Sequence, residues 1–526
     1  MPEFETLDFS EGWESLEREP MRQQLEEHAL PAYLSKQRWF ASKGTSIARV
    51  ELTRHSIFPG RGGDWLLATF RVRLADGRSE DYFLPLAIVW DTPSSPQSPR
   101  DSNEIIARIQ KGDQSGVLRD ALSDPRFIAE LVRTVGKNIT VNAFDGTLRF
   151  SHTHAYFHLQ ERDQQIIEAV GTEQSNSSIL IAQKMVLKAY RKLERGIQPE
   201  LEIGRYLTDV ANYGNTPPLL GSLEHFDAQG QTTALAIIQG FVANQGDGWS
   251  FTLAHLKRIF TSILQGGANK VTNGNHLALA EQLGLRVAEL HRALAIESGD
   301  PAFQPEPGTE SDVAGWKRQI QNEAESTLGL LASSESMLAP EQRDRVQALL
   351  DQRGQILNLI TRFELHQDAG IGKTRFHGDL HLGQVLVAGS DFYIIDFEGE
   401  PARPFAERRA KHSPLRDVAG ILRSLNYAAW SALFEAAEGE AEKITLLQKP
   451  ARDWEFEASN SFKHGYQKAI QGCSSCPADP NTFGRLLNLF ILEKALYEIR
   501  YELANRPSWL RIPVEGILSL LAERSA

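Results

Sequence analysis

Residues 374–398 constrain the fold of this chain more than any other segment. They read TRFHGDLHLGQVLVAGSDFYIIDFE, with two short apolar runs on either side of a Gly-Ser-Asp turn. Such runs predict a β-hairpin, although the apolar spacing beyond residue 250 is otherwise predominantly helical. The hairpin therefore stands alone in a helical region. It places one carboxylate, Asp379, before its first strand and another, Asp396, after its second.

Two carboxylates at the ends of one hairpin are typical of phosphoryl transfer. One carboxylate accepts the proton of the attacking hydroxyl, and the other, with an amide partner, holds Mg²⁺ on the phosphates. Asp379 is the candidate base, and Asp396 and Gln384 are the candidate metal ligands. The pattern resembles the catalytic and metal loops of the protein-kinase-like fold, with Gln384 for the usual Asn and Glu398 for the usual Gly. The alternative is a hairpin with ordinary surface acids.

The parts that bind a nucleotide are expected upstream. Lys188 lies in the apolar strand MVLKAY, where a buried charge needs an acidic partner. The helix that begins at Pro199 offers Glu200 and Glu202, which point about 200° apart, so only one can face Lys188. Apolar periodicity does not choose between them. The strand AIIQGF ends near residues 239–242, which are a candidate hinge for adenine.

The order of predicted elements indicates an α+β chain. With 526 residues, it is long enough for about three to four compact units. We expect a β-rich cap over residues 1–110, the rest of a mixed α/β small lobe over 111–242, and a mainly helical large lobe over 243–526. This distribution predicts two lobes with a cleft between them. The acidic first 20 residues, with Phe and Trp among them, read as a linker or docking segment.

Composition excludes several classes of protein. The net charge of −12 repels polyanions, so we expect no nucleic-acid partner. No apolar run reaches the length of a membrane span, and the acidic start differs from a signal peptide, so the chain reads as cytoplasmic. Cys473 and Cys476 form a lone C-x-x-C, read as a solvent-facing loop pair rather than a metal or redox site.

Several longer blocks carry a more specific resemblance. They are QRWFASKG (37–44), EQSNSS (173–178), LKAYRKLERGIQPELE (187–202), QGFVANQGDGW (239–249), HGDLHLGQV (377–385), DFEGEPARP (396–404), SPLRDVAGILRS (413–424) and EKALYEIRYELANRPSWLRIP (493–513). In these blocks the chain resembles the bacterial maltokinases, including those fused to trehalose synthase. The resemblance implies a bilobal protein-kinase-like fold with an N-terminal cap. It also implies ATP-dependent phosphorylation of maltose at its anomeric hydroxyl, with maltose 1-phosphate feeding α-glucan (glycogen) synthesis and trehalose synthase as a possible partner.

The resemblance also assigns roles to residues. It makes Lys188 the phosphate lysine and favours Glu202 as its partner. His377 and Asp417 would brace the catalytic loop. The loop that covers the phosphates would be polar instead of Gly-rich, and the hinge would contact adenine; these two groups are Ser175, Asn176, Ser177 and Ser178, and Gln239, Phe241 and Val242.

The sugar site is expected in the helical lobe. In the last block, Lys494, Tyr497, Glu498 and Tyr501 share one face of a helix. Charged groups beside aromatic rings suit a disaccharide, which has both hydroxyls and an apolar C–H face. A solvent-exposed face with a Lys–Glu pair is the alternative. His381 and Arg416 are further candidates.

Two other functions compete with maltose phosphorylation. The acceptor could be another sugar such as glucosamine, whose ammonium group would call for an acid in the pocket. The chain could instead be a non-catalytic module that regulates trehalose synthase. The presence of Lys188, Asp379, Gln384 and Asp396 argues against the second alternative.

Overall fold

The computed structural model describes residues 6–91, 104–160, 167–169, 176–266, 274–363, 370–401 and 403–522. The chain divides into two compact units. The first comprises Met1–Asp209 with Pro217–Val242, and the second comprises Val210–Thr216 with Ala243–Ala526. Each unit is described by itself. In the described part of the chain, no helix combines the length and apolar character that crossing a bilayer requires.

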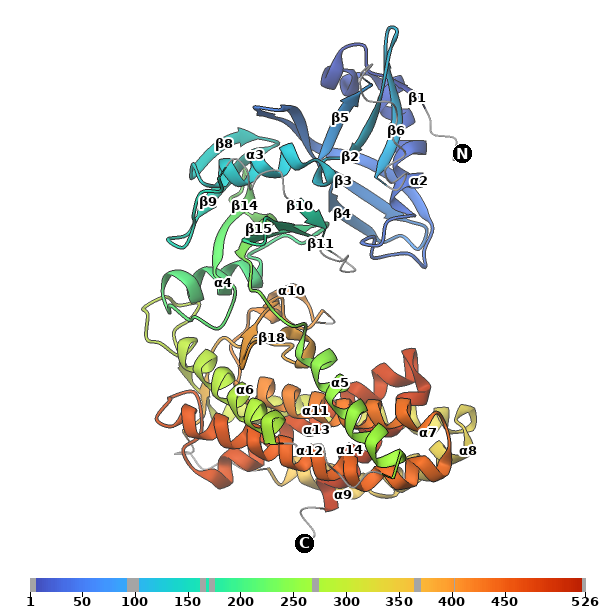
Figure 1. Cartoon of the computed structure of the whole chain (residues 1–526), viewed down its shortest axis with the longest axis vertical. Coiled ribbons are helices and arrows are strands. Elements are labelled where there is room, and N and C mark those ends of the chain that lie inside the picture. Colours follow the sequence, from blue (N-terminus) through green and yellow to red (C-terminus); the bar gives the residue numbers. More distant parts are fainter. Residues whose placement is uncertain are drawn as a thin grey trace. The chain divides into compact units, whose positions relative to one another are not determined.

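The first unit begins with a mostly antiparallel sheet, drawn in blue in Figure 1. Its hydrogen-bonded order is β1-β6-β7-β5-β3-β4-β13, and β2 pairs with β3. The β2–β3 hairpin turns through a short Gly-rich loop in which Gly60 pairs with Gly63. The strands are β1 (Thr6–Asp8), β2 (Ile47–Gly60), β3 (Gly63–Leu74), β4 (Ser79–Phe83), β5 (Leu86–Trp90), β6 (Ile105–Lys111), β7 (Gln114–Asp120) and β13 (Lys192–Leu193).

Residues 6–17 are part of this fold, which corrects the expectation of a linker for this segment. β1 pairs in parallel with β6, and Leu7, Phe9 and Leu16 are completely buried. The short helices α1 (Glu19–Gln24) and α2 (Leu30–Leu34) follow within the predicted β-rich region. Apolar side chains spaced among many acids therefore pack against the sheet, a contact that local composition does not reveal.

A second sheet in the first unit carries the predicted nucleotide-binding residues. Its order is β10-β11-β12-β15-β14-β9-β8, all antiparallel. The apolar strand that holds Lys188 is β12, and the predicted helix at Pro199 is α4. The bounds are β8 (Ile139–Ala143), β9 (Gly146–His152), β10 (Ile167–Ala169), β11 (Asn176–Ile181), β12 (Met185–Tyr190), β14 (Leu219–Asp227), β15 (Thr232–Gly240), α3 (Pro125–Val135) and α4 (Pro199–Asp209).

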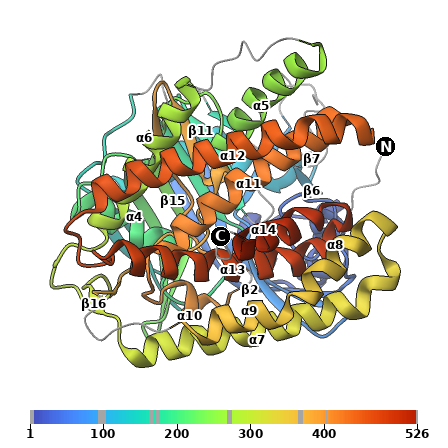
Figure 2. The same ribbon diagram turned by 90° about the horizontal axis from the view of Figure 1, so that it is seen from below.

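The second unit is a helical assembly around one buried helix. α11 packs against α5, α12 and α13 (Figure 2). Almost all of its side chains are buried. The helices are α5 (Gly248–Leu264), α6 (Gly274–Ala293), α7 (Glu310–Ser334), α8 (Pro340–Asp351), α9 (Arg353–Thr361), α10 (Phe405–Arg408), α11 (Leu415–Ala437), α12 (Ala441–Ile470), α13 (Pro480–Asn505) and α14 (Arg511–Ala522).

Two short antiparallel ladders complete the second unit. One is the predicted hairpin, β18 (Val385–Ala388) with β19 (Asp391–Ile394), and the other is β16 (Glu306–Pro307) with β17 (Gly372–Lys373). Arg286 on α6 anchors the turn of the first hairpin because its guanidinium donates two hydrogen bonds of 2.7 Å to Asp391. Mixed sheets followed by a helical lobe confirm the predicted α+β class.

The C-x-x-C segment differs from its prediction. Cys473 is half-buried, whereas Cys476 is buried, and the two thiols are free. Burial, with the neighbouring Cys473, raises the pKa of the Cys476 thiol to about 12. The prediction of a solvent-facing pair is therefore wrong for Cys476, because the loop folds back against Tyr466 of α12.

Candidate active site

The two carboxylates at the hairpin ends are held by a shared set of buried groups. The His377 ring lies between their loops: its Nδ1 accepts from the Asp379 amide at 3.3 Å, and its Nε2 donates to the Ile395 carbonyl at 2.8 Å. His377 is only 1% exposed, so this bridge is shielded from water. The segments that precede and follow the hairpin are thus tied together, which brings Asp379 and Asp396 to one end of it.

Asp417, in the first turn of α11, holds the same loop from beneath. Its carboxylate accepts hydrogen bonds from the amides of His377 and Gly378, at 2.8 and 2.9 Å, and from His291 Nε2 at 3.1 Å. Burial by itself would raise the pKa of Asp417, but the hydrogen bond from His291 and the neighbouring donors lower it below the usual value. Asp417 therefore remains ionised and accepts from the loop that carries Asp379, the arrangement that a bracing role requires.

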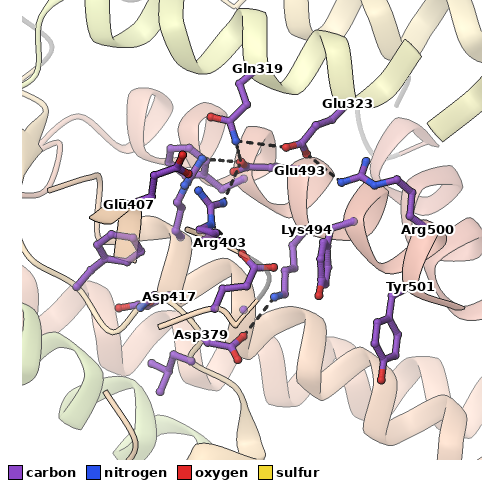
Figure 3. A pocket seen from close by; sticks show the side chains of 18 of the residues that line it. Gln319, Glu323, Asp379, Arg403, Glu407, Asp417, Glu493, Lys494, Arg500 and Tyr501 are labelled. Carbon is purple, nitrogen blue, oxygen red and sulfur yellow. Dashed lines mark hydrogen bonds and ion pairs between the residues drawn. The ribbon is translucent and has the colours of Figure 1, made fainter. Parts of the chain in front are cut away.

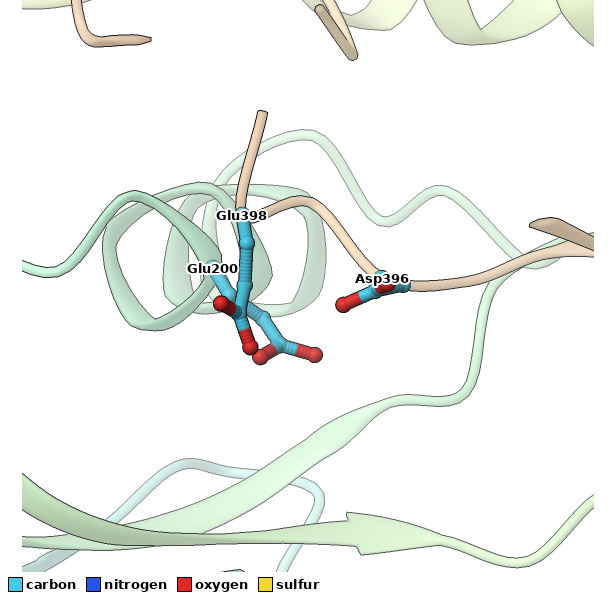
Figure 4. Close-up of side chains that lie close together, drawn as sticks. All are labelled: Glu200, Asp396 and Glu398. Atoms are coloured by element: carbon cyan, nitrogen blue, oxygen red, sulfur yellow. The ribbon is translucent and has the colours of Figure 1, made fainter. Parts of the chain in front are cut away.

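The segment after β19 provides oxygen atoms suited to a hard divalent cation. Asp396 has a φ of 66°, in the left-handed region that non-glycine residues rarely adopt. Residues with this strained backbone are often found at functional sites. Gln384 donates from its Nε2 to Asp396 Oδ2 at 2.8 Å, which orients both side chains. Figure 4 shows Asp396 and Glu398 on the same loop, and their carboxylate oxygens lie within 4.8 Å of each other. Carboxylate and amide oxygens are the ligands that Mg²⁺ prefers.

Asp379 also faces a cavity of about 510 Å³ in the second unit (Figure 3). Lys494 on α13 places its Nζ 3.5 Å from Asp379 Oδ1 and 4.9 Å from the centre of the Tyr497 ring. Tyr497 and Tyr501 stack with ring centres 6.4 Å apart. Burial opposes the charge of Lys494, but nearby carboxylates, Asp379 foremost, raise its pKa. The lysine therefore stays protonated beside the candidate base.

Ion pairs line the wall of this pocket opposite Asp379 (Figure 3). Arg416 lies 2.5 Å from Glu493, and burial lowers the pKa of Arg416 and raises that of Glu493. The other charged pairs are Arg403 with Glu400 at 2.9 Å, Arg403 with Glu493 at 3.8 Å, and Arg500 with Glu323 at 3.6 Å. These acids have counterions within the protein, so the wall offers oriented hydrogen-bond groups rather than a strong net charge.

The six residues predicted to bind sugar divide into two groups. Lys494, Tyr497, Tyr501 and Arg416 line the pocket, whereas Glu498 and His381 do not. Glu498 is 9% exposed and accepts two hydrogen bonds from Arg423 of α11, at 2.9 and 2.6 Å. The prediction for Glu498 is wrong because α13 is covered on this side by α11, whose buried arginine requires a counterion.

His381 instead caps the short turn Leu382–Gln384. Its Nδ1 accepts from the Gly383 amide at 3.0 Å, and burial lowers the pKa of its ring. Some pocket residues were not predicted, although they lie within blocks that carry the family resemblance. They are Glu400, Arg403 and Glu493.

In the first unit, Lys188 has a buried acidic partner, but it is not Glu202. Lys188 Nζ lies 2.9 Å from Glu200 Oε2, and the Tyr190 hydroxyl donates to the same oxygen at 2.9 Å. Lys188 is 5% exposed and Glu200 only 1%. Figure 4 labels Glu200 on α4. The choice of Glu202 is therefore wrong, because the rotation of α4 about its axis turns the preceding glutamate toward β12.

The predicted phosphate loop leads into β11, next to the strand of Lys188. Ser178 is paired with Lys188 across the sheet, and the Ser177 hydroxyl accepts from Arg191 Nε at 2.8 Å. Asn176 is buried at the start of β11, whereas Ser175 lies outside the described residues.

The predicted hinge follows the same sheet. Gln239, the last residue but one of β15, pairs with Val186, and the Phe241 amide donates to the Lys184 carbonyl at 2.9 Å. Val242 is the last residue of the first unit.

Comparison with known proteins finds sugar kinases among the similar proteins. The family model of the maltokinase N-terminal cap domain matches residues 33–124. A glucosamine kinase from Streptacidiphilus jiangxiensis is 25% identical over 353 residues, which cover 67% of this chain and 73% of that protein. A glucosamine kinase from Mycolicibacterium smegmatis is 26% identical over 363 residues, covering 67% of this chain and 79% of that protein.

Solved structures give the same fold. A glucosamine kinase in complex with glucosamine, ADP and inorganic phosphate superimposes with a TM-score of 0.62 at 19% identity, covering 93% of this chain and 99% of that one. Crystal form B of a glucosamine kinase gives a TM-score of 0.63 at 20% identity, covering 94% and 97%. The two glucosamine kinases that match in sequence support a phosphotransferase of the sugar-kinase class, and the solved structures show its fold. The expected resemblance to the maltokinase family is thus confirmed: the chain carries a maltokinase N-terminal cap domain and has the kinase-like fold of the glucosamine kinases.

Proposed function

We propose that this protein is an ATP-dependent maltokinase that phosphorylates the anomeric hydroxyl of maltose. The observation that carries the proposal is the placement of Asp379 in the same pocket as Lys494 and the stacked pair Tyr497–Tyr501. A base, a cation beside it and an aromatic surface are the groups that a sugar hydroxyl needs in order to bind and react.

Asp379 accepts the proton of the anomeric hydroxyl in this mechanism. Lys494 orients that carboxylate, while the hydrogen bonds from His377 and to Asp417 hold the loop in place. Positioning of this kind supplies much of the rate in phosphoryl transfer, where little covalent work falls to the protein.

The residues present fit a Mg²⁺–ATP co-substrate. Asp396 and Gln384 would hold the metal, with Glu398 as a further oxygen donor, and Lys188 oriented by Glu200 would hold the phosphates. When bound, Mg²⁺ neutralises the charge that develops on the phosphate oxygens. The polar residues of β11 and the hinge at 239–242 are proposed to contact the nucleotide.

The extent of the pocket favours a disaccharide over a single sugar ring. Tyr501 lies seven residues beyond Lys494 on α13, which corresponds to about 10 Å along the helix. One ring bound at Asp379 would leave the second tyrosine uncovered. The paired acids of the wall suit neutral hydroxyls, because no ammonium is needed to neutralise them.

A glucosamine kinase is the second candidate function. The relatives described above favour it, and so does Glu407, an exposed carboxylate in the pocket lining that has no ion-pair partner among the described residues. Such a group could receive the ammonium of an amino sugar.

A comparison of acceptors separates the two candidates. The protein is mixed with ATP, Mg²⁺ and either maltose or glucosamine, and the phosphorylated sugar is identified by mass spectrometry. We expect a phosphorylated disaccharide and a higher kcat/KM for maltose. A higher kcat/KM for glucosamine would replace the proposal by the second candidate, and no phosphorylated sugar with either would refute both.

The base assignment is tested by Asp379→Asn, which keeps a hydrogen-bond acceptor toward Lys494. The matched control is Asp453→Asn, which changes an exposed carboxylate on α12 paired with Lys449. We expect the first variant to fold and to lose most turnover, and the control to keep it. Unchanged turnover in Asp379→Asn would remove this residue from the mechanism, whereas no turnover by the wild-type chain would favour a non-catalytic, regulatory module.

We also propose that trehalose synthase supplies the maltose, with the product entering α-glucan synthesis. The two proteins together, given trehalose, ATP and Mg²⁺, should accumulate the phosphorylated disaccharide. Failure to form it from trehalose, when maltose added directly is phosphorylated, would exclude this supply.

A further inference from the structure

A second cavity in the second unit lies apart from the acceptor pocket. It has a volume of about 450 Å³ and is lined by α11, α12, α13 and α14, which lie side by side in Figure 2. None of its lining residues also lines the acceptor pocket. Its size is in the range of small-molecule sites.

Asn426 of α11 makes this cavity more than a packing gap. The residue is 6% exposed and lines the cavity, yet its Oδ1 has no hydrogen-bond partner in the described part of the chain. An unsatisfied buried carbonyl costs about 1–3 kcal/mol, so such groups in native proteins call for an explanation. A donor from a bound molecule, such as a hydroxyl, would satisfy it.

The rest of the lining points to a polyhydroxylated ligand. Ser459, Asn460, Asn488 and Ser519 each provide groups that can donate and accept hydrogen bonds. Phe456 stands at the same cavity with 65% of its surface exposed. Amides and hydroxyls beside an exposed ring match the hydroxyls and the C–H face of a saccharide.

The charges of the lining favour an anionic group on that ligand. Arg423 is paired with Glu498 at 2.6 Å, and Glu515 with Arg345 at 3.1 Å, so these charges are compensated within the protein. Arg452 and Lys463 are also in the lining, and neither has an ion-pair partner among the residues that the structure describes. Glu455 is the one other acid there, which leaves an excess of positive charge.

We propose that this cavity binds a phosphorylated saccharide. The phosphate is recognised by the cationic groups of α12, and the sugar hydroxyls are recognised by Asn426 and its polar neighbours. Arginine and lysine are the usual phosphate ligands in proteins. The inference does not depend on which sugar the enzyme phosphorylates.

Isothermal titration without ATP tests the proposal, with glucose 1-phosphate as the probe and the full chain as the receptor. Asn426→Leu replaces a buried polar group by an apolar one of similar shape, so it should preserve or improve folding. We expect it to weaken binding roughly five- to tenfold, the equivalent of one hydrogen bond. Lys463→Gln should weaken binding at least tenfold, since it removes a charged contact. Leu446→Ala is the control, because Leu446 is 53% exposed on α12 and lies outside the lining.

Four results would overturn the proposal. Equal affinity for inorganic phosphate would exclude recognition of the sugar, and equal affinity for unphosphorylated glucose would exclude recognition of the phosphate. Binding that is lost in Tyr497→Ala but unchanged in Asn426→Leu would place the probe in the acceptor pocket. Absence of binding by the wild-type chain would refute the site. None of these results would bear on the proposed maltokinase activity, which is tested by a separate assay.

Discussion

Asp417→Asn tests how the catalytic loop is held. The wild-type carboxylate is 2% exposed and accepts three hydrogen bonds: Oδ2 accepts from the His377 amide and from His291, and Oδ1 accepts from the Gly378 amide. An asparagine keeps one oxygen and replaces the other with an NH₂ group, which cannot accept. At least one buried donor then loses its acceptor, and the remaining bonds become neutral.

The cost follows from these contacts. A hydrogen bond to a charged group contributes about 1.5–3 kcal/mol and a neutral one about 0.5–1.5 kcal/mol, while an unsatisfied buried donor costs about 1–3 kcal/mol. The variant should therefore lose about 3 kcal/mol of local stability, or roughly two orders of magnitude in the opening equilibrium of the loop. Because a displacement of about 1 Å at a reacting group can cost about 100-fold in rate, kcat should fall by a similar factor while KM for the sugar changes little.

Hydrogen exchange at the His377 and Gly378 amides measures the opening of the loop, and steady-state kinetics with maltose measures the change in kcat. Asp453→Asn serves again as the control. The wild-type bond is also pH-dependent: the lowered pKa of Asp417 means that its stabilisation is present above the pKa of the unfolded carboxyl, about 3.9, and is lost as the pH falls through the folded value. If exchange at both amides and kcat are as in wild type, the bracing role is refuted.

Three further predictions test other parts of the structure. Glu200→Gln should lower kcat/KM for ATP at least tenfold and Glu202→Gln much less; the reverse order would contradict the observed ion pair. Burial and a neighbouring histidine lower the pKa of His276 to about 3, so wild-type stability to urea should decline as the pH falls from about 6.5 toward 3. His276→Phe should reduce that decline, and an identical pH profile would show that the group is not responsible. Glu498→Gln leaves the buried charge of Arg423 poorly paired, so it should destabilise the protein by about 3 kcal/mol and leave KM for maltose nearly unchanged; a raised KM without destabilisation would return Glu498 to the sugar site.

The local parts of the fold could be predicted because their signals are contained in short segments. The hairpin at 385–394, the strand of Lys188 and the helix at Pro199 all arise from apolar runs, turn residues and helix-start residues that are adjacent in the chain. The same holds for the order of carboxylates around the catalytic hairpin. Motif spacing of this kind predicts which residues carry chemistry, since phosphoryl transfer requires particular groups at particular positions along one loop.

Only the tertiary structure decided which neighbours those residues have. Glu200 and Glu202 are equivalent in the sequence pattern, and the rotation of α4 against β12 selects Glu200. Likewise, Lys494 and Glu498 share a helix face, but they have different partners. Glu498 forms an ion pair with Arg423 of the packed helix α11, whereas Lys494 lies beside Asp379. Periodicity states which residues point the same way from one helix. It does not state what lies opposite, because that depends on side chains brought together from distant parts of the chain by burial of apolar surface.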